Sequence, residues 1–215
     1  MDSIIYKSMD ELYSIDKEML FTGDYNMGTK PVPPAQGGFL VIRPSVERFN
    51  EYQAIIRKGD WGNKGWGGSG IGRFWGGQTI QGIVPYFYHS IHPGDAQEMN
   101  RCIYNCMVDN PYRKNTKICL NQQPSCEDCR TQKIENVVSA HFTICQKPWT
   151  CTSFTNPNNK VLCEQLHIEW FKLRDEFEKS LGKYWKNTYI LIWSNVHSSY
   201  VIIEIFLLHL LLLRY

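Results

Sequence analysis

The chain has 215 residues, of which 43% are hydrophobic and 13% aromatic, which is enough for one well-buried globular domain and too little for two large ones. Its formal net charge of +2 does not indicate a surface for nucleic acid, so any recognition of phosphate must come from local groups. Seven tryptophans and twelve tyrosines exceed the usual need of such a core, and aromatic surfaces are common where sugars dock.

The N-terminal residues predict a strand that runs directly into a helix. Residues 3–6 are an apolar run typical of a short buried strand, and residues 8–11 match a capping box that opens a brief helix. Asp2 stands just before this strand. Taken alone, an aspartate at a chain terminus indicates no binding site, so a role for Asp2 depends on the resemblance described below.

A loop and a central strand follow. Residues 21–34 are rich in glycine and proline, which predicts a loop of the kind that carries binding groups, and Asp24 lies within it. The apolar run within residues 36–45 predicts a central strand stopped by Pro44. Ser45 is then expected to be the N-cap of a helix that continues to about Lys58.

Residues 59–77 combine many glycines with three tryptophans, a composition that neither helix nor strand tolerates well. We expect an ordered loop that is pinned by its aromatic side chains. Residues 65–70 match the pattern G-x-G-x-x-G, but no strand is predicted before them and no helix directly after them, so a dinucleotide-binding fingerprint is not expected. The sequence also lacks Gly-Lys-Ser/Thr, which excludes a P-loop.

All eight cysteines lie between Cys102 and Cys163. This clustering favours disulfides formed in an oxidising compartment, and we expect most of the eight to pair with one another. Zinc is the alternative, because Cys126 and Cys129 have the spacing of half a zinc site, but no second pair has a matching spacing. Residues 95–135 are polar and cysteine-rich, and we expect them to form an insertion on the scaffold.

Residues 137–142 return to a strand pattern that delivers His141, and Lys147 follows six residues later beside a Pro-Trp corner. A neutral imidazole suits borderline divalent ions, and a lysine is a compact charge for a diphosphate, so the pair fits a metal–diphosphate complex. The structural alternative is a histidine satisfied at a strand end, next to a surface lysine and a core tryptophan.

The segment His141-Phe-Thr-Ile-Cys-Gln-Lys147-Pro148-Trp149 resembles the His-Phe-x-Gly-x-x-Lys-Pro-Trp signature of the glycogenin-like glycosyltransferases, glycosyltransferase family 8. Ile144 stands at the glycine position of that signature. The resemblance implies that His141 binds manganese and that Lys147 contacts the diphosphate of a sugar nucleotide. It also implies that Asp2 is a metal ligand, because Asp2 matches the second aspartate of the family's Asp-x-Asp.

Two other segments carry the resemblance. Residues 36–45 are similar to the family's Asn-x-Gly-(apolar)-x-Pro-Ser element, which implies that Gln36 replaces the asparagine facing the donor sugar and that Gly38 is the motif glycine. Asp24 sits where the family has an acidic loop residue near the sugar. Residues 78–86 resemble the family's Asp-Gln-Gly helix start, which places Gln81 at the donor.

In that last motif Ile80 replaces the aspartate that usually contacts the donor sugar. The resemblance covers about residues 2–175 and implies an α/β fold with a mainly parallel, Rossmann-like sheet, part of a glycosyltransferase-A fold with a cysteine-rich insertion. The implied reaction is the retaining transfer of a hexosyl or uronosyl group from a uridine-diphosphate sugar to a hydroxyl of a carbohydrate or protein acceptor, with Mn²⁺ or Mg²⁺ as cofactor.

Two further classes stay open: a catalytically degenerate member of this family, and a cysteine-stapled carbohydrate-binding module. In the family, the uridine-binding strands and the first aspartate of Asp-x-Asp precede the segment matched here. We therefore expect the chain, taken as it stands, to lack a base pocket and one metal ligand and to be an inefficient transferase.

From Cys163 the sequence predicts an amphipathic helix whose apolar stripe would pack on the sheet. The stripe comprises Leu166, Trp170, Leu173, Phe177 and Leu181. We place the catalytic domain at residues 1–185 and a hydrophobic tail at residues 186–215.

Within the tail, residues 189–213 are strongly apolar, but their uninterrupted part is about 15 residues, short of the roughly 20 that span a bilayer. A transmembrane span, a buried or interfacial helix and a non-native extension all stay open. The cysteines and the resemblance together predict the lumen of the Golgi or secretory pathway, with membrane association through this tail.

Overall fold

The computed structural model describes residues 2–25, 27, 32–110, 127–150, 157–181 and 201–202. In chain order its elements are β1 (Ser3–Ile5), the 3-10 helix η1 (Asp10–Ser14), β2 (Met19–Gly23), β3 (Ala35–Ile42), α1 (Val46–Lys58), β4 (Trp61–Gly62), β5 (Gly65–Trp66), α2 (Ile80–Tyr86), the π-helix η2 (Phe87–Ile91), β6 (Ala96–Glu98), β7 (Tyr104–Cys106), the 3-10 helices η5 (Cys129–Thr131) and η6 (Ile134–Asn136), β8 (Ser139–His141), the 3-10 helix η7 (Pro148–Thr150), α3 (Pro157–Ser180) and β9 (Val201–Ile202).

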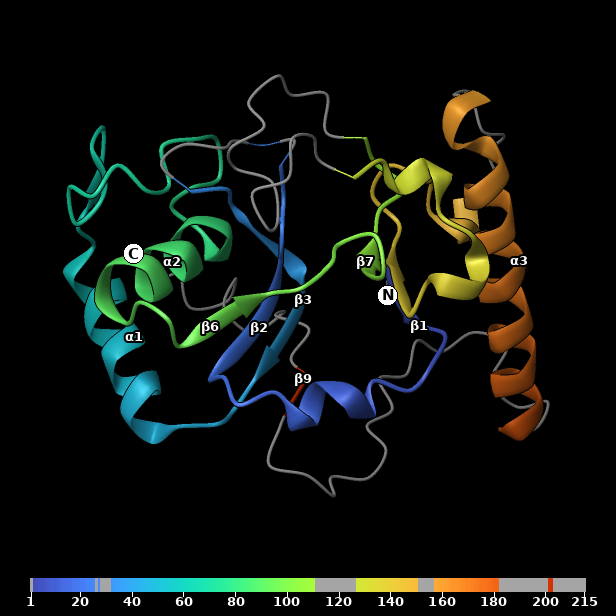
Figure 1. Ribbon diagram of the computed structural model, residues 1–215, viewed down its shortest axis with the longest axis horizontal. Helices are drawn as coiled ribbons and strands as arrows, with labels where there is room; N and C mark the ends of the chain where they lie inside the picture. The colour runs from blue at the N-terminus through green and yellow to red at the C-terminus, as the bar shows by residue number, and fades with distance from the viewer. Residues whose placement is uncertain are drawn as a thin grey trace.

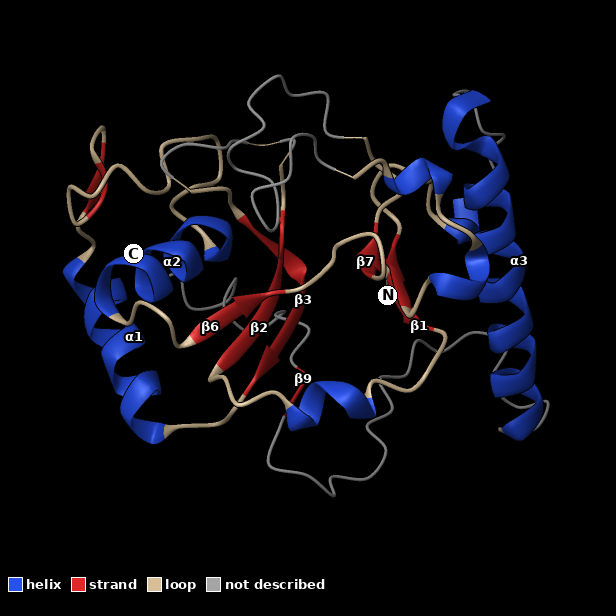
Figure 2. Ribbon diagram, in the orientation of Figure 1, coloured by secondary structure: helices blue, strands red, loops and turns tan. Residues whose placement is uncertain are grey.

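Two small mixed sheets form the centre of the molecule, and the longer helices flank them (Figures 1 and 2). The four-stranded sheet has the order β6-β2-β3-β9, and the three-stranded sheet has the order β1-β8-β7. In Figure 1 α1 and α2 lie beside the first sheet and α3 lies beyond the second. The predicted α/β class is therefore confirmed at this level.

The prediction of a mainly parallel sheet is wrong for the described strands. Only β2–β6 and β7–β8 pair in parallel, whereas β1–β8, β2–β3 and β3–β9 pair antiparallel. The reason lies in the connections: only residues 24–34 link β2 to β3, and so short a link suits antiparallel neighbours, since parallel ones need a longer crossover.

The N-terminal predictions are only partly right. Residues 21–23 belong to β2 instead of a loop, and all three are buried in the sheet. β1 is partly exposed instead of buried, since it lies at the edge of its sheet. The predicted capping box does not form either: Ser8 Oγ accepts a hydrogen bond from Asp10 N–H at 3.1 Å, one residue short of Glu11.

The expectation of an insertion at residues 95–135 is also wrong where the structure describes it. This stretch supplies β6 to the four-stranded sheet, next to β2, and β7 to the three-stranded sheet, next to β8. Each of these strands has three residues and mixes polar with apolar side chains, so neither leaves a periodic pattern in the sequence. The stretch therefore belongs to the scaffold.

Two disulfides confirm that the cysteine-rich region is cross-linked. Cys102 bonds to Cys129 and Cys145 bonds to Cys163. Because Cys129 is in a disulfide, it is not half of a zinc site. Cys106 is buried and is the described cysteine outside these disulfides, and burial raises its pKa to about 12, so it stays a thiol. Cys119, Cys126 and Cys151 lie outside the described residues.

The core under α3 explains how far its apolar stripe is buried. α3 begins at Pro157, six residues before the predicted start, and Leu162 and Leu166 pack against the three-stranded sheet. Trp170 is only partly buried and Phe177 is 41% exposed. A helix of 24 residues is about 36 Å long, several times the length of a three-residue strand, so its C-terminal half extends past the sheet.

The glycine-rich loop is ordered and pinned by aromatic residues, as the sequence predicts. The indole N–H groups of Trp61 and Trp66 donate to the carbonyls of Gly72 and Gly77, at 3.1 and 2.8 Å. β4 and β5 pair within it as a small hairpin. Trp75 in the same loop is 88% exposed.

The predicted N-cap of α1 is confirmed, and it allows a simple stability test. Ser45 Oγ accepts a hydrogen bond from Arg48 N–H at 3.2 Å, and Gly59 ends the helix with φ 61°. We expect Ser45→Ala to lower the free energy of unfolding by about 1 kcal/mol, because one N–H of the first turn loses its partner. Urea denaturation measures this loss. Ser45→Asp, which keeps an acceptor, is the control, and equal midpoints for the alanine variant and the parent would contradict the cap.

The predicted domain boundary at residues 185–186 and nearly all of the tail lie outside the described residues. The exception is β9, which pairs antiparallel with β3 through Val41 and Ile42. Within the described ranges, the helices are each too short or too polar to cross a bilayer.

Candidate functional site

Asp2, just before β1, lies beside His141, the last residue of the neighbouring strand β8. In the antiparallel pair of β1 and β8, Ser3 stands opposite His141, and the N–H of Phe142 donates to the main-chain carbonyl of Asp2 at 2.7 Å. Asp2 therefore stands just before the start of β1, next to the end of β8. Antiparallel pairing joins the two residues, and not two parallel strands that end at one edge of a sheet.

Lys147 completes a cluster with these two residues. Its Nζ lies 2.5 Å from Oδ2 of Asp2, although 145 positions separate the two in the sequence. Burial alone would raise the pKa of Asp2, but the hydrogen bond and charge of Lys147, with a smaller effect of His141, outweigh it and lower that pKa. The carboxylate is thus ionised, as a metal ligand must be.

The imidazole of His141 is held in its neutral form. Its partial burial lowers its pKa below the ordinary value of 6.5, and Lys147 acts in the same direction, while Asp2 opposes both. Nδ1 is buried and has no hydrogen-bond partner among the described residues. A buried polar atom without a partner is costly, which makes it notable at a candidate site.

Gly38 of β3 lies directly against this imidazole. A Cβ at Gly38 would lie 2.5 Å from Cε1 of His141 and closer still to Nδ1, which real side chains do not tolerate. Only glycine can therefore occupy this position while His141 keeps its place. This contact brings the four-stranded sheet up to the end of β8, so both sheets meet at the site.

Gln36 and Asp24 support Gly38 from inside the protein. Gln36 Nε2 donates to Oδ2 of Asp24 at 3.1 Å and to Sδ of Met107 at 3.2 Å, and Gln36 Oε1 accepts from the N–H of Gly38 at 3.1 Å. Asp24 and Gln36 are each only 6% exposed. In this structure the amide of Gln36 makes its hydrogen bonds within the protein and orients the backbone at Gly38.

Gln81 lies in the first turn of α2, next to the glycine-rich loop. A Cβ at Gly76 would lie 3.5 Å from Oε1 of Gln81. Its neighbour Ile80 contacts β3, since a Cβ at Gly37 would lie 2.9 Å from Cγ2 of Ile80. α2 thus begins beside the residue that precedes Gly38, but no hydrogen bond or ion pair joins Gln81 to the described residues Asp2, His141 or Lys147.

A buried polar group next to Asp24 was missed by the sequence analysis. The hydroxyl of Tyr25 donates to Oε1 of Glu98 at 2.6 Å, and the guanidinium of Arg101 lies 5.5 Å from the ring centre of Tyr25. Arg101 also pairs with buried Asp109, with 3.4 Å between Nε and Oδ2. Glu98 ends β6 and Arg101 follows it, and this strand is too short to detect in the sequence, so no signal there could have located them.

Burial raises the pKa of Glu98, and this effect outweighs the opposing effects of Tyr25, the main chain of Gly23 and Arg101. A Cβ at Gly23 would lie 2.5 Å from Oε1 of Glu98, so the carboxyl group packs on the end of β2. These groups fill the interior at the carboxyl ends of the parallel pair β2–β6, beside Asp24.

The chemistry of Asp2 and His141 fits a divalent ion. One carboxylate and one neutral imidazole suit manganese, and carboxylate oxygen suits magnesium. Asp2 and His141 could supply two ligands, and the described residues contain no group of three or more histidine, cysteine, aspartate or glutamate side chains placed to hold a metal.

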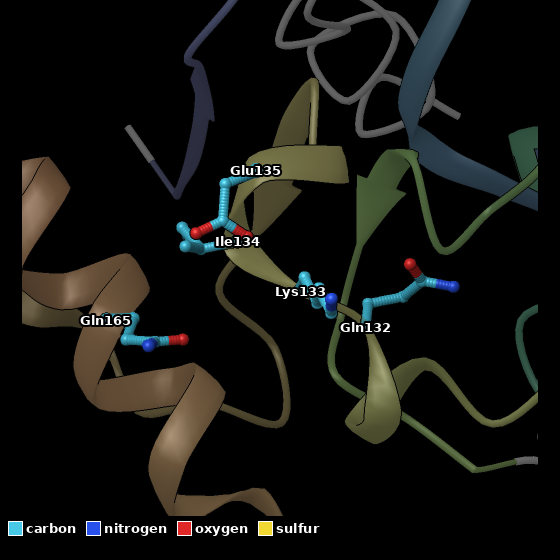
Figure 3. Close-up of a pocket in the computed structure, with 5 residues that line it drawn as sticks. All are labelled: Gln132, Lys133, Ile134, Glu135 and Gln165. Atoms are coloured by element: carbon cyan, nitrogen blue, oxygen red, sulfur yellow. The ribbon is translucent and has the colours of Figure 1, made fainter.

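A pocket of about 630 Å³ lies away from this cluster, between η6 and α3. It is open and is lined by Gln132, Lys133, Ile134, Glu135 and Gln165. In Figure 3 these side chains do not converge on one point, since Gln132 extends away from Gln165. The cluster at His141 is the better candidate because it combines a buried nitrogen without a partner among the described residues, an ion pair and a lowered carboxyl pKa.

Comparison with protein families, curated proteins and solved structures finds no match to this chain.

Proposed function

We propose that this chain carries the donor-binding region of a metal-dependent, retaining glycosyltransferase of the glycogenin-like type. It would bind a uridine-diphosphate sugar and transfer a hexosyl or uronosyl group to a hydroxyl of a carbohydrate or protein acceptor. The observation that carries the proposal is the meeting of Asp2, His141 and Lys147 with Gly38. These residues come from three separate motifs of the family, and nothing in the local sequence requires the three motifs to meet.

Each residue has a distinct role in this proposal. Asp2 and His141 would hold Mn²⁺ or Mg²⁺, which supplies positive charge that stabilises the diphosphate as it leaves the sugar. Lys147 would bind the same diphosphate as a point charge, exchanging its present partner Asp2 for phosphate oxygens. Gly38 leaves the space in which the imidazole lies. Gln36, which is hydrogen-bonded to Asp24, orients the backbone of Gly38.

We also propose that the protein works in the lumen of the Golgi or secretory pathway. The two disulfides support this, because such bonds persist in oxidising compartments and are rare in the cytosol. Association with a membrane through residues 189–213 belongs to the same proposal and depends on the apolar sequence of that segment.

One observation favours a second candidate, a protein that binds the sugar nucleotide without turning it over. The family's aspartate at the start of α2 is replaced by Ile80, whose side chain packs on Gly37. An apolar group there offers no hydrogen bond to a donor sugar. Binding of nucleotide without hydrolysis would distinguish this candidate from an active transferase.

Calorimetry with UDP in the presence of Mn²⁺, followed by hydrolysis assays with several uridine-diphosphate sugars, tests the proposal. We expect Lys147→Met to weaken UDP binding by about 10- to 100-fold, because a charge-assisted hydrogen bond to phosphate is lost. Lys64→Met, which removes an exposed lysine of the glycine-rich loop, is the matched control. A parent protein that does not bind UDP would contradict the proposal, and binding without hydrolysis would favour the second candidate.

A further inference from the structure

The segment that carries Lys147 is fastened to α3 on both sides of that lysine. Before it, Cys145 forms a disulfide with Cys163 of α3, with their Cα atoms 5.4 Å apart. After it, the rings of Trp149 and Trp170 lie 6.0 Å apart. We call residues 142–150 the lysine segment.

Of the contacts with α3, the one made by His167 lies nearest to Lys147 in the sequence. Its Nε2 lies 2.6 Å from the carbonyl oxygen of Gln146, the residue that precedes the lysine. A carbonyl oxygen can only accept, so Nε2 must carry the hydrogen of this bond. The ring of Phe142 packs edge-on against the imidazole at 5.4 Å and 67°, which fixes the orientation of His167.

The other contacts of Lys147 are too weak to hold it in place. Its ion pair with Asp2 is partly exposed, with the two side chains 32% and 48% accessible, and such pairs contribute little because water and salt screen them. The carbonyl of Lys147 accepts from the N–H and hydroxyl of Thr150, at 3.0 and 2.7 Å, which shapes the turn but does not attach it to the fold. The attachment comes from α3.

We infer that His167, together with the Cys145–Cys163 disulfide, is a positioning device that holds Lys147 where it can bind the diphosphate of the donor. This inference depends on the proposed function and deepens it. His167 acts through the main chain of Gln146 and does not itself touch the nucleotide. Asp2 and His141 are held by the pairing of β1 with β8, so the device governs nucleotide binding and leaves metal binding alone.

Calorimetry on the full chain separates these two functions. For His167→Ala we expect UDP affinity in Mn²⁺ to fall by about two- to tenfold, the effect of one lost hydrogen bond that orders a ligand-binding group. The affinity for Mn²⁺ alone should stay within about twofold of that of the parent, since the substitution leaves the metal site unchanged and so leaves its dissociation constant for Mn²⁺ unchanged. His167→Gln, whose amide can donate to the same carbonyl, should recover UDP affinity.

Gln165→Ala is the matched control, because Gln165 is an exposed residue of the same helix and makes none of these contacts. Unchanged UDP affinity in His167→Ala, or a parallel loss of Mn²⁺ and UDP binding, would overturn the inference. A parent protein that binds Mn²⁺ but no UDP would instead overturn the proposed function, so the two failures differ.

A second pair of variants tests the disulfide. Replacing Cys145 and Cys163 by serine should weaken UDP binding more than replacing Cys102 and Cys129. Only the first bridge has a cysteine within the lysine segment. Equal effects of the two double variants would mean that the Cys145–Cys163 bridge has only a structural role. If either double variant does not fold, the His167 series decides the question.

Discussion

Replacing His141 by alanine should weaken manganese binding by at least about 100-fold, because loss of a ligand exceeds the effect of losing a supporting group around a metal, which is about 10–100-fold. Manganese-dependent turnover should disappear with it. The free energy of unfolding should change little, since the imidazole is partly exposed and its Nδ1 forms no hydrogen bond among the described residues. Calorimetry or manganese electron paramagnetic resonance measures the binding, and urea denaturation measures the stability.

The pH dependence of manganese binding by the parent protein is a second test of the role of His141. Because burial lowers the pKa of His141, its imidazole stays neutral below the ordinary value of 6.5, and a protonated imidazole cannot bind a metal. We therefore expect manganese affinity to persist at pH 6.5 and to fall only at lower pH. His89→Ala, which removes an exposed histidine, is the control. Manganese binding that survives the loss of His141 would show that the ion is held elsewhere.

The helices could be predicted from the sequence because their signals are local. Ser45 offers an acceptor to the first turn of α1, and Gly59 adopts the left-handed conformation that ends it. A single residue therefore marks each end of the helix. α3 is marked by the spacing of Leu166, Trp170 and Leu173. Its exposed C-terminal half could not be predicted, because exposure depends on how far the sheet beneath it extends.

The strands could not be predicted to the same extent. β6 and β7 have three residues each and are stabilised by the strands beside them, so their sequences carry no pattern of their own. The direction of pairing is also set by the partners, and the family resemblance favoured a parallel sheet that the described strands do not form. Glu98 and Arg101 were missed for the same reason, since the first ends a strand that the sequence does not reveal and the second follows it.

The meeting of Asp2 and His141 was anticipated from motifs, yet the fold achieves it differently from the expected way. The register of β1 on β8 places the first residue of one strand opposite the last residue of the other. Lys147 then reaches Asp2 from a turn fastened to α3, which no motif specifies. Sequence reasoning can name residues that share a chemistry, but pairing register and disulfides decide how they approach.

Replacing Gly38 by alanine should lower the free energy of unfolding by about 1–3 kcal/mol, the usual effect of forcing a methyl group into a packed site. The reason is specific, since the new Cβ would lie 2.5 Å from Cε1 of His141 and the imidazole would have to move. Manganese affinity should fall as well, because the displaced ring no longer faces the ion. Urea denaturation and calorimetry measure the two effects.

A double-mutant cycle tests whether the imidazole of His141 causes the loss of stability in Gly38→Ala. In the His141→Ala background the methyl group of Gly38→Ala meets no ring, so the loss of stability should largely vanish, and the coupling between the two positions should be about 1–3 kcal/mol. Gly62→Ala is the matched control, because a Cβ there would have no neighbour within 4 Å, and its effect should stay within about 0.5 kcal/mol. If Gly38→Ala destabilised both backgrounds equally, the strain would come from β3 itself, and the packing of His141 on Gly38 would no longer explain the glycine of this motif.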